Sequence, residues 1–105
     1  MKSAFATLSD PNRRAILILL ADEARTVGDL EAALDLSQPA VSKHLRVMRD
    51  AGLVEATVDA QRRVYRILPA PLQEVEAWLA PFRRYWSRQV DALERHLDSQ
   101  HPTDN

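Results

Sequence analysis

Two helix-start signals separated by a very short connection constrain the fold of this chain more than any other feature. Thr26 and Asp29 have the capping-box spacing, and Ser37 has the side chain of a second cap, ahead of a helix over about residues 38–51. The turn over residues 35–37 is so short that the first helix must pack across the second. This segment therefore predicts a helix-turn-helix.

A strand–turn–strand pattern follows at once. Gly52 stands where a helix commonly ends in a left-handed residue. Residues 53–58 and 63–68 are rich in β-branched and aromatic side chains and partly alternate in polarity, as the strands of a hairpin do. The residues between them contain neither Gly nor Asn, so we expect a looser loop than a two-residue primed turn. The order helix, short turn, helix, hairpin is that of a winged helix-turn-helix.

The segments on either side are predicted to be helical. Residues 3–8 can form a short helix, and Ser9-Asp10-Pro11 supplies the cap and the first-turn proline of a longer one that ends near Ala21. Residues 22–25 are expected to form a loop. After Pro71, apolar residues recur at spacings of three and four and predict a long amphipathic helix, which Pro81 should kink or break.

Together these patterns predict a mainly α chain with a small β-hairpin. The low glycine content, 2 of 105 residues, agrees with a mostly helical chain. The length allows one domain. The predicted organisation is a single winged helix domain over residues 1–98, with a helix-turn-helix over about 26–51, a wing over about 53–68 and a C-terminal helical dimerisation segment over about 71–98, followed by a disordered tail over 99–105.

One face of the second helix of the motif is cationic. The net charge of the whole chain is −1, but basic residues outnumber acidic ones between Ser37 and Arg66, and the balance reverses from Ala70 onward. At 100° per residue the apolar side chains fall on the opposite face of the helix. The cationic face carries Gln38, Ser42, Lys43, Arg46 and Arg49. Such donors suit the major groove of duplex DNA, although an ordinary solvated face is the alternative.

The predicted hairpin carries a pair of arginines near its tip. Arg62 and Arg63 are placed to lie along a DNA backbone or to enter a minor groove. Paired arginines on a hairpin can also simply increase solubility. The combination of short turn, cationic helix and basic hairpin favours DNA binding over that alternative.

The chain also resembles a known family. Residues 29–54, DLEAALDLSQPAVSKHLRVMRDAGLV, are similar to the recognition region of ArsR/SmtB-type repressors, and residues 8–17, LSDPNRRAIL, resemble the first long helix of that family. Residues 64–67, VYRI, resemble its second wing strand. The resemblance is closest over residues 5–68. It implies a dimeric winged-helix repressor that binds DNA, from a branch whose members often repress their own operons.

The resemblance and the cationic face together give a set of DNA-binding residues. His44 lies on the flank of the buried face, so we expect it to pack or to contact a phosphate rather than read a base. The predicted DNA-binding residues are Ser37, Gln38, Ser42, Lys43, His44, Arg46, Arg62 and Arg63.

Neither a metal nor another cofactor is expected. The chain has no Cys, so it can form neither disulfides nor thiolate metal sites. At the positions that resemble the metal ligands of the family, the chain has Thr26, Gly28 and Glu31 in one site and Leu72, Arg83 and Trp86 in the other. An alternative metal set near the chain end is Glu94, Asp98 and His101.

The apolar stripe of the C-terminal helix predicts a homodimer. Two tryptophans and a long row of leucines would be costly to leave in water, and a domain this small has limited surface to cover them. Packing on the chain's own domain is the alternative. The predicted interface residues are Phe5, Leu8, Ile16, Leu79, Phe82, Trp86, Val90, Leu93 and Leu97.

The sequence therefore predicts a repressor, with its own promoter as one target, that binds double-stranded DNA at an inverted repeat. A winged helix used only for protein contacts is the alternative function. An enzyme is not expected, because no cofactor motif or orienting triad is present. We expect no signal peptide and no membrane span, since the longest apolar run, residues 15–21, is too short, and hence a cytoplasmic protein. No residue pattern names an inducer.

Overall fold

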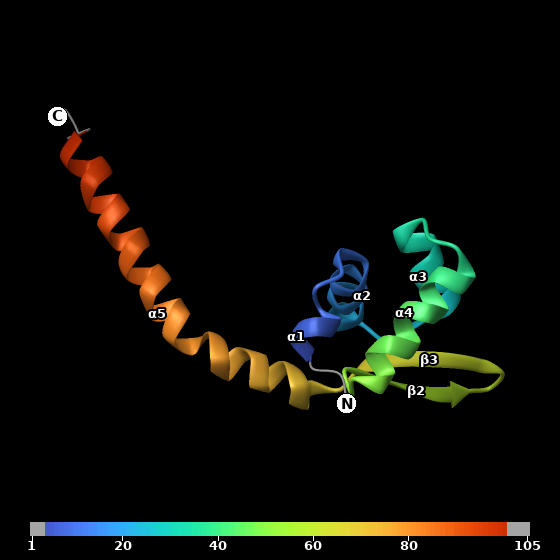
Figure 1. Ribbon diagram of the computed structural model, residues 1–105. Helices are drawn as coiled ribbons and strands as arrows, with labels where there is room; N and C mark the ends of the chain where they lie inside the picture. The colour runs from blue at the N-terminus through green and yellow to red at the C-terminus, as the bar shows by residue number, and fades with distance from the viewer. Residues whose placement is uncertain (1–3, 101–105) are drawn as a thin grey trace. The chain divides into compact units, whose positions relative to one another are not determined.

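A computed structural model describes residues 4–100 of the chain (Figure 1). It is mainly helical with a small sheet, as predicted. The chain divides into two compact units, residues 1–75 and 76–105, and the helix-turn-helix and wing lie in the first. The elements are α1 (Ala4–Thr7), α2 (Pro11–Asp22), β1 (Arg25–Thr26), α3 (Val27–Leu34), α4 (Gln38–Asp50), β2 (Val54–Asp59), β3 (Arg62–Ile67) and α5 (Pro69–Gln100).

Local hydrogen bonds start α2 and α4 where the sequence predicts. The Asp10 carboxylate accepts from the N–H groups of Asn12 at 2.7 Å and Arg13 at 3.2 Å. The Ser37 hydroxyl accepts from the N–H of Ala40 at 3.3 Å. Each cap satisfies donors that the first helical turn leaves without a backbone partner. The starts of these helices are therefore encoded locally.

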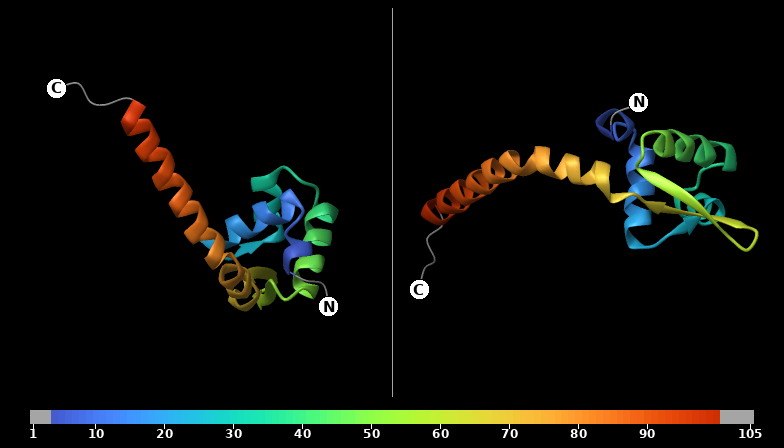
Figure 2. Two further views of the ribbon diagram at one scale, coloured as in Figure 1. Left: turned by 60° about the vertical axis from the view of Figure 1, so that its left-hand side comes forward. Right: turned by 90° about the horizontal axis from the view of Figure 1, so that it is seen from below.

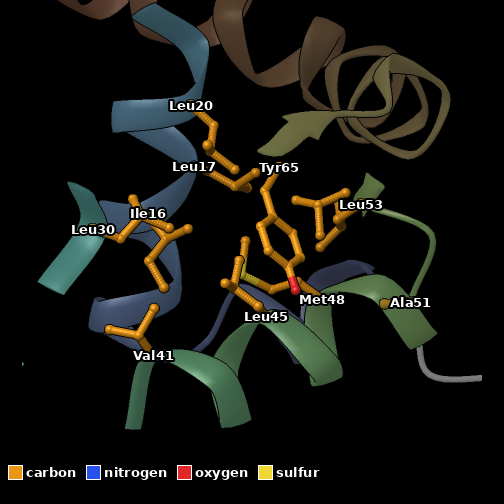
Figure 3. Close-up of a cluster of buried hydrophobic side chains, with 11 residues drawn as sticks. Ile16, Leu17, Leu20, Leu30, Val41, Leu45, Met48, Ala51, Leu53 and Tyr65 are labelled. Carbon is orange, nitrogen blue, oxygen red and sulfur yellow. The ribbon is translucent and has the colours of Figure 1, made fainter. Parts of the chain in front are cut away.

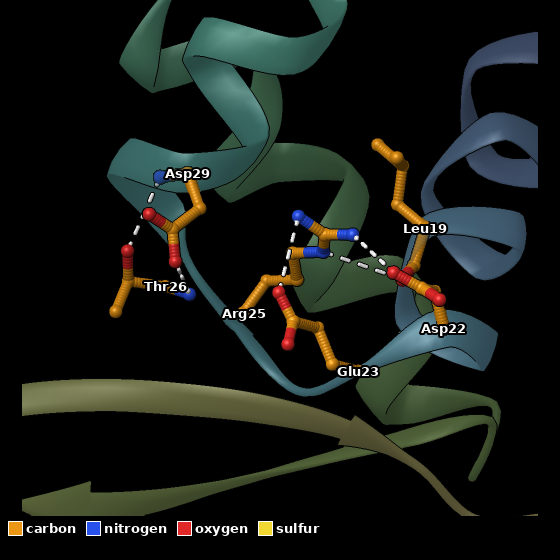
Figure 4. A network of polar contacts seen from close by, with 6 residues as sticks. All are labelled: Leu19, Asp22, Glu23, Arg25, Thr26 and Asp29. Atoms are coloured by element: carbon orange, nitrogen blue, oxygen red, sulfur yellow. Dashed lines mark hydrogen bonds and ion pairs between the residues drawn. The ribbon is translucent and has the colours of Figure 1, made fainter.

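The start of α3 is a complete capping box (Figure 4). The Asp29 N–H donates to the Thr26 hydroxyl at 3.1 Å, and the Thr26 N–H donates to the Asp29 carboxylate at 3.0 Å. These hydrogen bonds from Thr26 lower the pKa of Asp29 below its ordinary value, because they favour the ionised form. At the other end, Asp35 adopts a left-handed conformation with φ 54°, which turns the chain sharply towards α4.

The sheet has three strands in the order β1-β3-β2, all antiparallel. The loop predicted over residues 22–25 is wrong at its end, because Arg25 pairs with Tyr65 and adds a strand. The looser hairpin loop is also wrong. Asp59 pairs with Arg62, which leaves a two-residue turn in which Ala60 has φ 58°. Ladder pairing on both sides of the turn fixes this conformation despite its cost for alanine.

An arginine clamps the chain between α2 and β1 (Figure 4). The Arg25 guanidinium contacts the carboxylates of Asp22 at 3.1 Å and Glu23 at 3.7 Å, and donates to the carbonyl of Leu19 at 3.3 Å. This network ties the end of α2 to the edge of the sheet. It therefore helps to place α3 and α4 relative to the wing.

The core of the first unit joins α2, α3, α4 and the sheet (Figure 3). Ile16 from α2 and Leu30 from α3 are fully buried. The apolar face of α4 packs against them, and Leu53, Val54 and Tyr65 close the core from the hairpin side. The tip of the hairpin projects beyond the helices (Figures 1 and 2). The buried hydrophobic residues are Ile16, Leu17, Leu20, Leu30, Val41, Leu45, Met48, Ala51, Leu53, Val54 and Tyr65.

The C-terminal helix differs from its prediction in two respects. Of the two outcomes predicted at Pro81, a kink or a break, the break does not occur, since α5 is a single helix from Pro69 to Gln100. Proline removes one N–H donor, and the many remaining helical hydrogen bonds carry the helix past it. The disordered tail was predicted from Ser99, but Ser99 is still helical, and residues 101–105 lie outside the described part of the chain.

Candidate nucleic-acid interface

A groove of about 730 Å³ lies between α4 and β3, where the second helix of the motif faces the wing. Its walls come from two segments that are distant in sequence, and the core described above holds them together. The lining residues are Gln38, Pro39, Ser42, Lys43, Leu45, Arg46, Arg49, Arg63 and Tyr65.

The two faces of α4 differ as predicted. Val41, Leu45 and Met48 are buried in the core, and this orientation turns Lys43 and Arg46 outward. Near the N-terminus of α4, the Gln38 side-chain amide donates to the Ser42 hydroxyl at 3.0 Å. The helix therefore presents a row of donors beside the groove.

The groove is strongly positive. Lys43, Arg46, Arg49 and Arg63 line it, and no carboxylate does. Among residues 4–100 the ion pairs involve Arg25 and Arg83, and none involves these four cations. Four unpaired cations around one cavity are well suited to bind an anion.

The two wing arginines point to opposite sides of the sheet. Successive side chains of a strand alternate, so Arg63 shares the groove face with Tyr65 and Arg62 faces away. The hydrogen bonds from Thr26 are the main cause of the lowered pKa of Asp29, and the positive charge of Arg62 makes a smaller contribution to it. The pair that the sequence suggested is therefore split between two surfaces.

The structure brings five of the predicted DNA-binding residues together in the groove: Gln38, Ser42, Lys43, Arg46 and Arg63. Ser37 instead caps α4, and Arg62 lies on the outer face of the wing. The sequence did not single out Tyr65. Its signal is the spacing of two from Arg63 in an alternating strand.

His44 is half-buried and lies outside the groove lining. Its Nδ1 is buried and has no hydrogen-bond partner within residues 4–100. The pKa of Asp10 is lowered overall. Desolvation raises it, but the hydrogen bonds from the N–H groups of Asn12 and Arg13 and the nearby charge of His44 outweigh that effect. His44 is therefore near the start of α2, and its role in packing or in contacting a phosphate stays a prediction.

The residues predicted for a dimer interface fall into two groups. Ile16 is 0% exposed within its own core, so its assignment to an interface is wrong. Apolar residues surround most of α2, and the sequence alone could not tell which of them faces inward; Ile18, not predicted, is 71% exposed. Leu8 packs against the core and Leu79 is half-buried. The exposed members of the set are Phe5, Phe82, Trp86, Val90, Leu93 and Leu97.

No residue of α5 is buried, and its exposed face is rich in aromatic side chains. The ring of Phe82 makes tilted contacts with the rings of Trp78 and Trp86, with centroid distances of 4.7 and 6.2 Å. Trp78 and Tyr85 extend the exposed face that the sequence predicted. This aromatic stripe is a large apolar surface for a monomer to leave in water.

Residues 4–100 contain no group of three His, Asp or Glu side chains that could hold a metal ion. Glu94 and Asp98 are exposed on α5, and His101 lies outside the described residues. No helix within the described range is long and apolar enough to cross a membrane.

Comparison with known proteins supports a regulator. Residues 10–56 match the family described as bacterial regulatory protein, arsR family. The chain is 37% identical to the HTH-type transcriptional regulator Rv2034 of Mycobacterium tuberculosis, over 92% of this chain and 88% of that one. It is 32% identical to the transcriptional repressor SdpR of Bacillus subtilis, over 78% of this chain and 91% of that one.

A solved structure shares the fold. A possible transcriptional regulator for arsenical resistance superposes with a TM-score of 0.70 and 32% identity, covering 91% of this chain and 97% of that chain. The relatives of this chain are transcriptional regulators and not enzymes. The chain belongs to the arsR family of bacterial regulatory proteins, which are DNA-binding transcriptional regulators.

Proposed function

We propose that the chain is a homodimeric repressor that binds an inverted repeat in a promoter, its own among them, through the groove between α4 and β3. The observation that carries the proposal is the set of four cations in that groove, free of ion pairs and of any lining carboxylate. Phosphate contacts supply most of the affinity of such interfaces. A groove built from these side chains is therefore suited to a DNA backbone.

Base reading is assigned to the exposed face of α4. Gln and Ser can hydrogen bond base edges, and Lys and Arg can reach the acceptors of guanine. Gln38 and Ser42 lie in the first half of α4, the part of a recognition helix that usually enters the major groove. Arg63 on β3 would then hold the adjoining backbone, which fixes the register of the helix.

The dimer is proposed from the aromatic stripe of α5. A second copy of the chain would bury Trp86, Leu93 and their neighbours, which the monomer leaves exposed. A two-fold symmetric dimer presents two copies of α4 and matches an inverted repeat, with half-sites about one helical turn apart or a multiple of that. Such a regulator would act in the cytoplasm of a bacterium, where the chromosome lies.

An inducer is not part of the proposal. We do not extend a role in arsenical resistance from the similar solved structure to this chain, because the sequence of this chain has no Cys to supply thiolate ligands.

The test is a fluorescence titration of a duplex from the region upstream of the chain's own gene, at two salt concentrations, with unlabelled random DNA as competitor. The proposal predicts tight binding that weakens with salt and survives the competitor. Arg46→Ala should weaken binding, whereas Arg88→Ala, an exposed arginine on α5, should not. Failure to bind this duplex or any promoter fragment from a genomic library would overturn the proposal and favour a role in protein contacts.

A further inference from the structure

The groove is lined in part by a tyrosine whose hydroxyl has no hydrogen-bond partner in the described part of the chain. Tyr65 is 7% exposed, and its ring lies in the core beside Leu45, Met48 and Leu53 (Figure 3). Within residues 4–100 the Tyr65 hydroxyl makes no hydrogen bond, and the only buried side-chain polar atom lacking one is Nδ1 of His44. The hydroxyl oxygen of Tyr65 is therefore accessible, and Tyr65 is one of the residues that line the groove.

Packing alone does not explain this hydroxyl. A buried tyrosine usually places its O–H against a hydrogen-bond partner, and phenylalanine would fill the same core volume without needing one. The buried lining residues are Leu45 and Tyr65, so the hydroxyl is a polar group on an otherwise apolar floor. The cationic side chains that line the same groove are Lys43, Arg46, Arg49 and Arg63. A neutral donor in a groove lined by cations is suited to bind an anionic oxygen.

We propose that the Tyr65 hydroxyl donates a hydrogen bond to a backbone phosphate of the bound duplex. This inference rests on the proposed function and adds the place where the DNA strand is held. Tyrosine is among the side chains that contact phosphates in protein–DNA complexes, and such contacts set register. The rigid ring, fixed by the core, gives this contact a direction that the flexible cations beside it cannot give.

The first experiment compares Tyr65→Phe with Tyr85→Phe. The chain has 2 tyrosines, and Tyr85 is exposed on α5, so it is a matched control for loss of a hydroxyl. We expect Tyr65→Phe to weaken binding to the upstream duplex by roughly 10- to 150-fold for each protomer's contact, as for a hydrogen bond to a charged group. The slope of log affinity against log salt should stay unchanged, because no cation is removed. Because Tyr85→Phe removes only a hydroxyl from α5 and keeps the apolar ring, it should have the oligomeric state of wild type in sedimentation and bind the duplex like wild type.

The second experiment identifies the phosphate. Duplexes that each carry one neutral methylphosphonate are titrated against wild type and Tyr65→Phe. At one position in each half-site the methylphosphonate should weaken wild type but weaken Tyr65→Phe much less, since both changes remove the same contact. Additive losses at every position, or wild-type affinity of Tyr65→Phe, would overturn the inference while leaving the proposed function intact.

A measurement on the unsubstituted fold covers the case in which Tyr65→Phe does not fold. Protein labelled with 3-fluorotyrosine has two fluorine resonances, which the Tyr85→Phe variant assigns. The Tyr65 resonance should shift on addition of the duplex and shift less with the methylphosphonate duplex. An unmoved Tyr65 resonance in a protein that binds the duplex refutes the contact, whereas no binding by wild type refutes the proposed function first.

Discussion

The opposite directions of Arg62 and Arg63 lead to a prediction that separates the groove from general positive charge. Both arginines are exposed, adjacent in sequence and near the tip of the same hairpin. Arg63 lines the groove and Arg62 does not. If DNA occupies the groove, Arg63→Ala removes a phosphate contact and Arg62→Ala removes only charge near the duplex.

The magnitude follows from counterion release. Each phosphate neutralised contributes about 0.9 to the slope of log affinity against log salt, so a dimer that loses both copies of Arg63 should lose about 1.8 from that slope. The same contribution amounts to about 60-fold in affinity at roughly 0.1 M salt. Wild type, with four groove cations in each protomer, should have a slope no steeper than about −7 from the groove.

The assay is a titration of the upstream duplex with wild type and each variant at four or more salt concentrations, with sedimentation to confirm that all three proteins have the same oligomeric state. Arg62→Ala should keep most of the wild-type slope. Equal losses of slope for the two variants would show that the wing acts through net charge and not through the groove, and would refute the assignment.

Three further predictions concern stability and assembly. Ile16→Ala should lower the free energy of unfolding by about 2–5 kcal/mol in chemical denaturation, whereas Ile18→Ala, at an exposed position of the same helix, should stay within about 0.5 kcal/mol; similar losses would contradict the buried orientation of Ile16. Thr26→Ala should lower the free energy of unfolding by about 0.5–2 kcal/mol through loss of the α3 cap. Because Thr26 lowers the pKa of Asp29, the stabilisation by ionised Asp29 should be present above the unfolded carboxyl pKa and should disappear as the pH falls through the lower folded value. The difference in Tm between wild type and Asp29→Asn should therefore narrow below about pH 4, and a constant difference would argue against this linkage. Trp86→Glu should convert the proposed dimer to monomer in analytical ultracentrifugation without lowering the helix content, and a variant that stays dimeric would remove α5 from the interface.

Features encoded within a few residues were predictable. Asp10, Thr26 and Ser37 start their helices because each carries an oxygen that a nearby N–H can reach, and this depends on no distant contact. Gly52, with φ 74°, follows α4 as its position predicts. The amphipathic face of α4 was equally readable, because its apolar and cationic residues separate cleanly at helical spacing.

Features that depend on distant pairing were not predictable. The strand β1 is only Arg25–Thr26, and it exists because β3 offers an edge at Val64 and Tyr65. The two-residue turn at Ala60 forms because the strands on both sides fix the register, although its residues have no preference for positive φ. The groove itself is such a feature. Arg63 and Tyr65 join α4 only through the fold, so the sequence supplied their chemistry but not their meeting.

The placement of carboxylates at helix starts explains how a chain of net charge −1 keeps one positive site. The start of α2 has Asp10 and the start of α3 has Asp29, so in both the positive end of the helix dipole already faces a carboxylate. The start of α4 has the neutral cap Ser37 and no acidic residue in its first turn. The N-terminal end of α4 therefore keeps its positive potential beside Gln38, where the groove begins. Among these three helices, the one assigned to DNA is the one whose dipole is left available to an incoming phosphate.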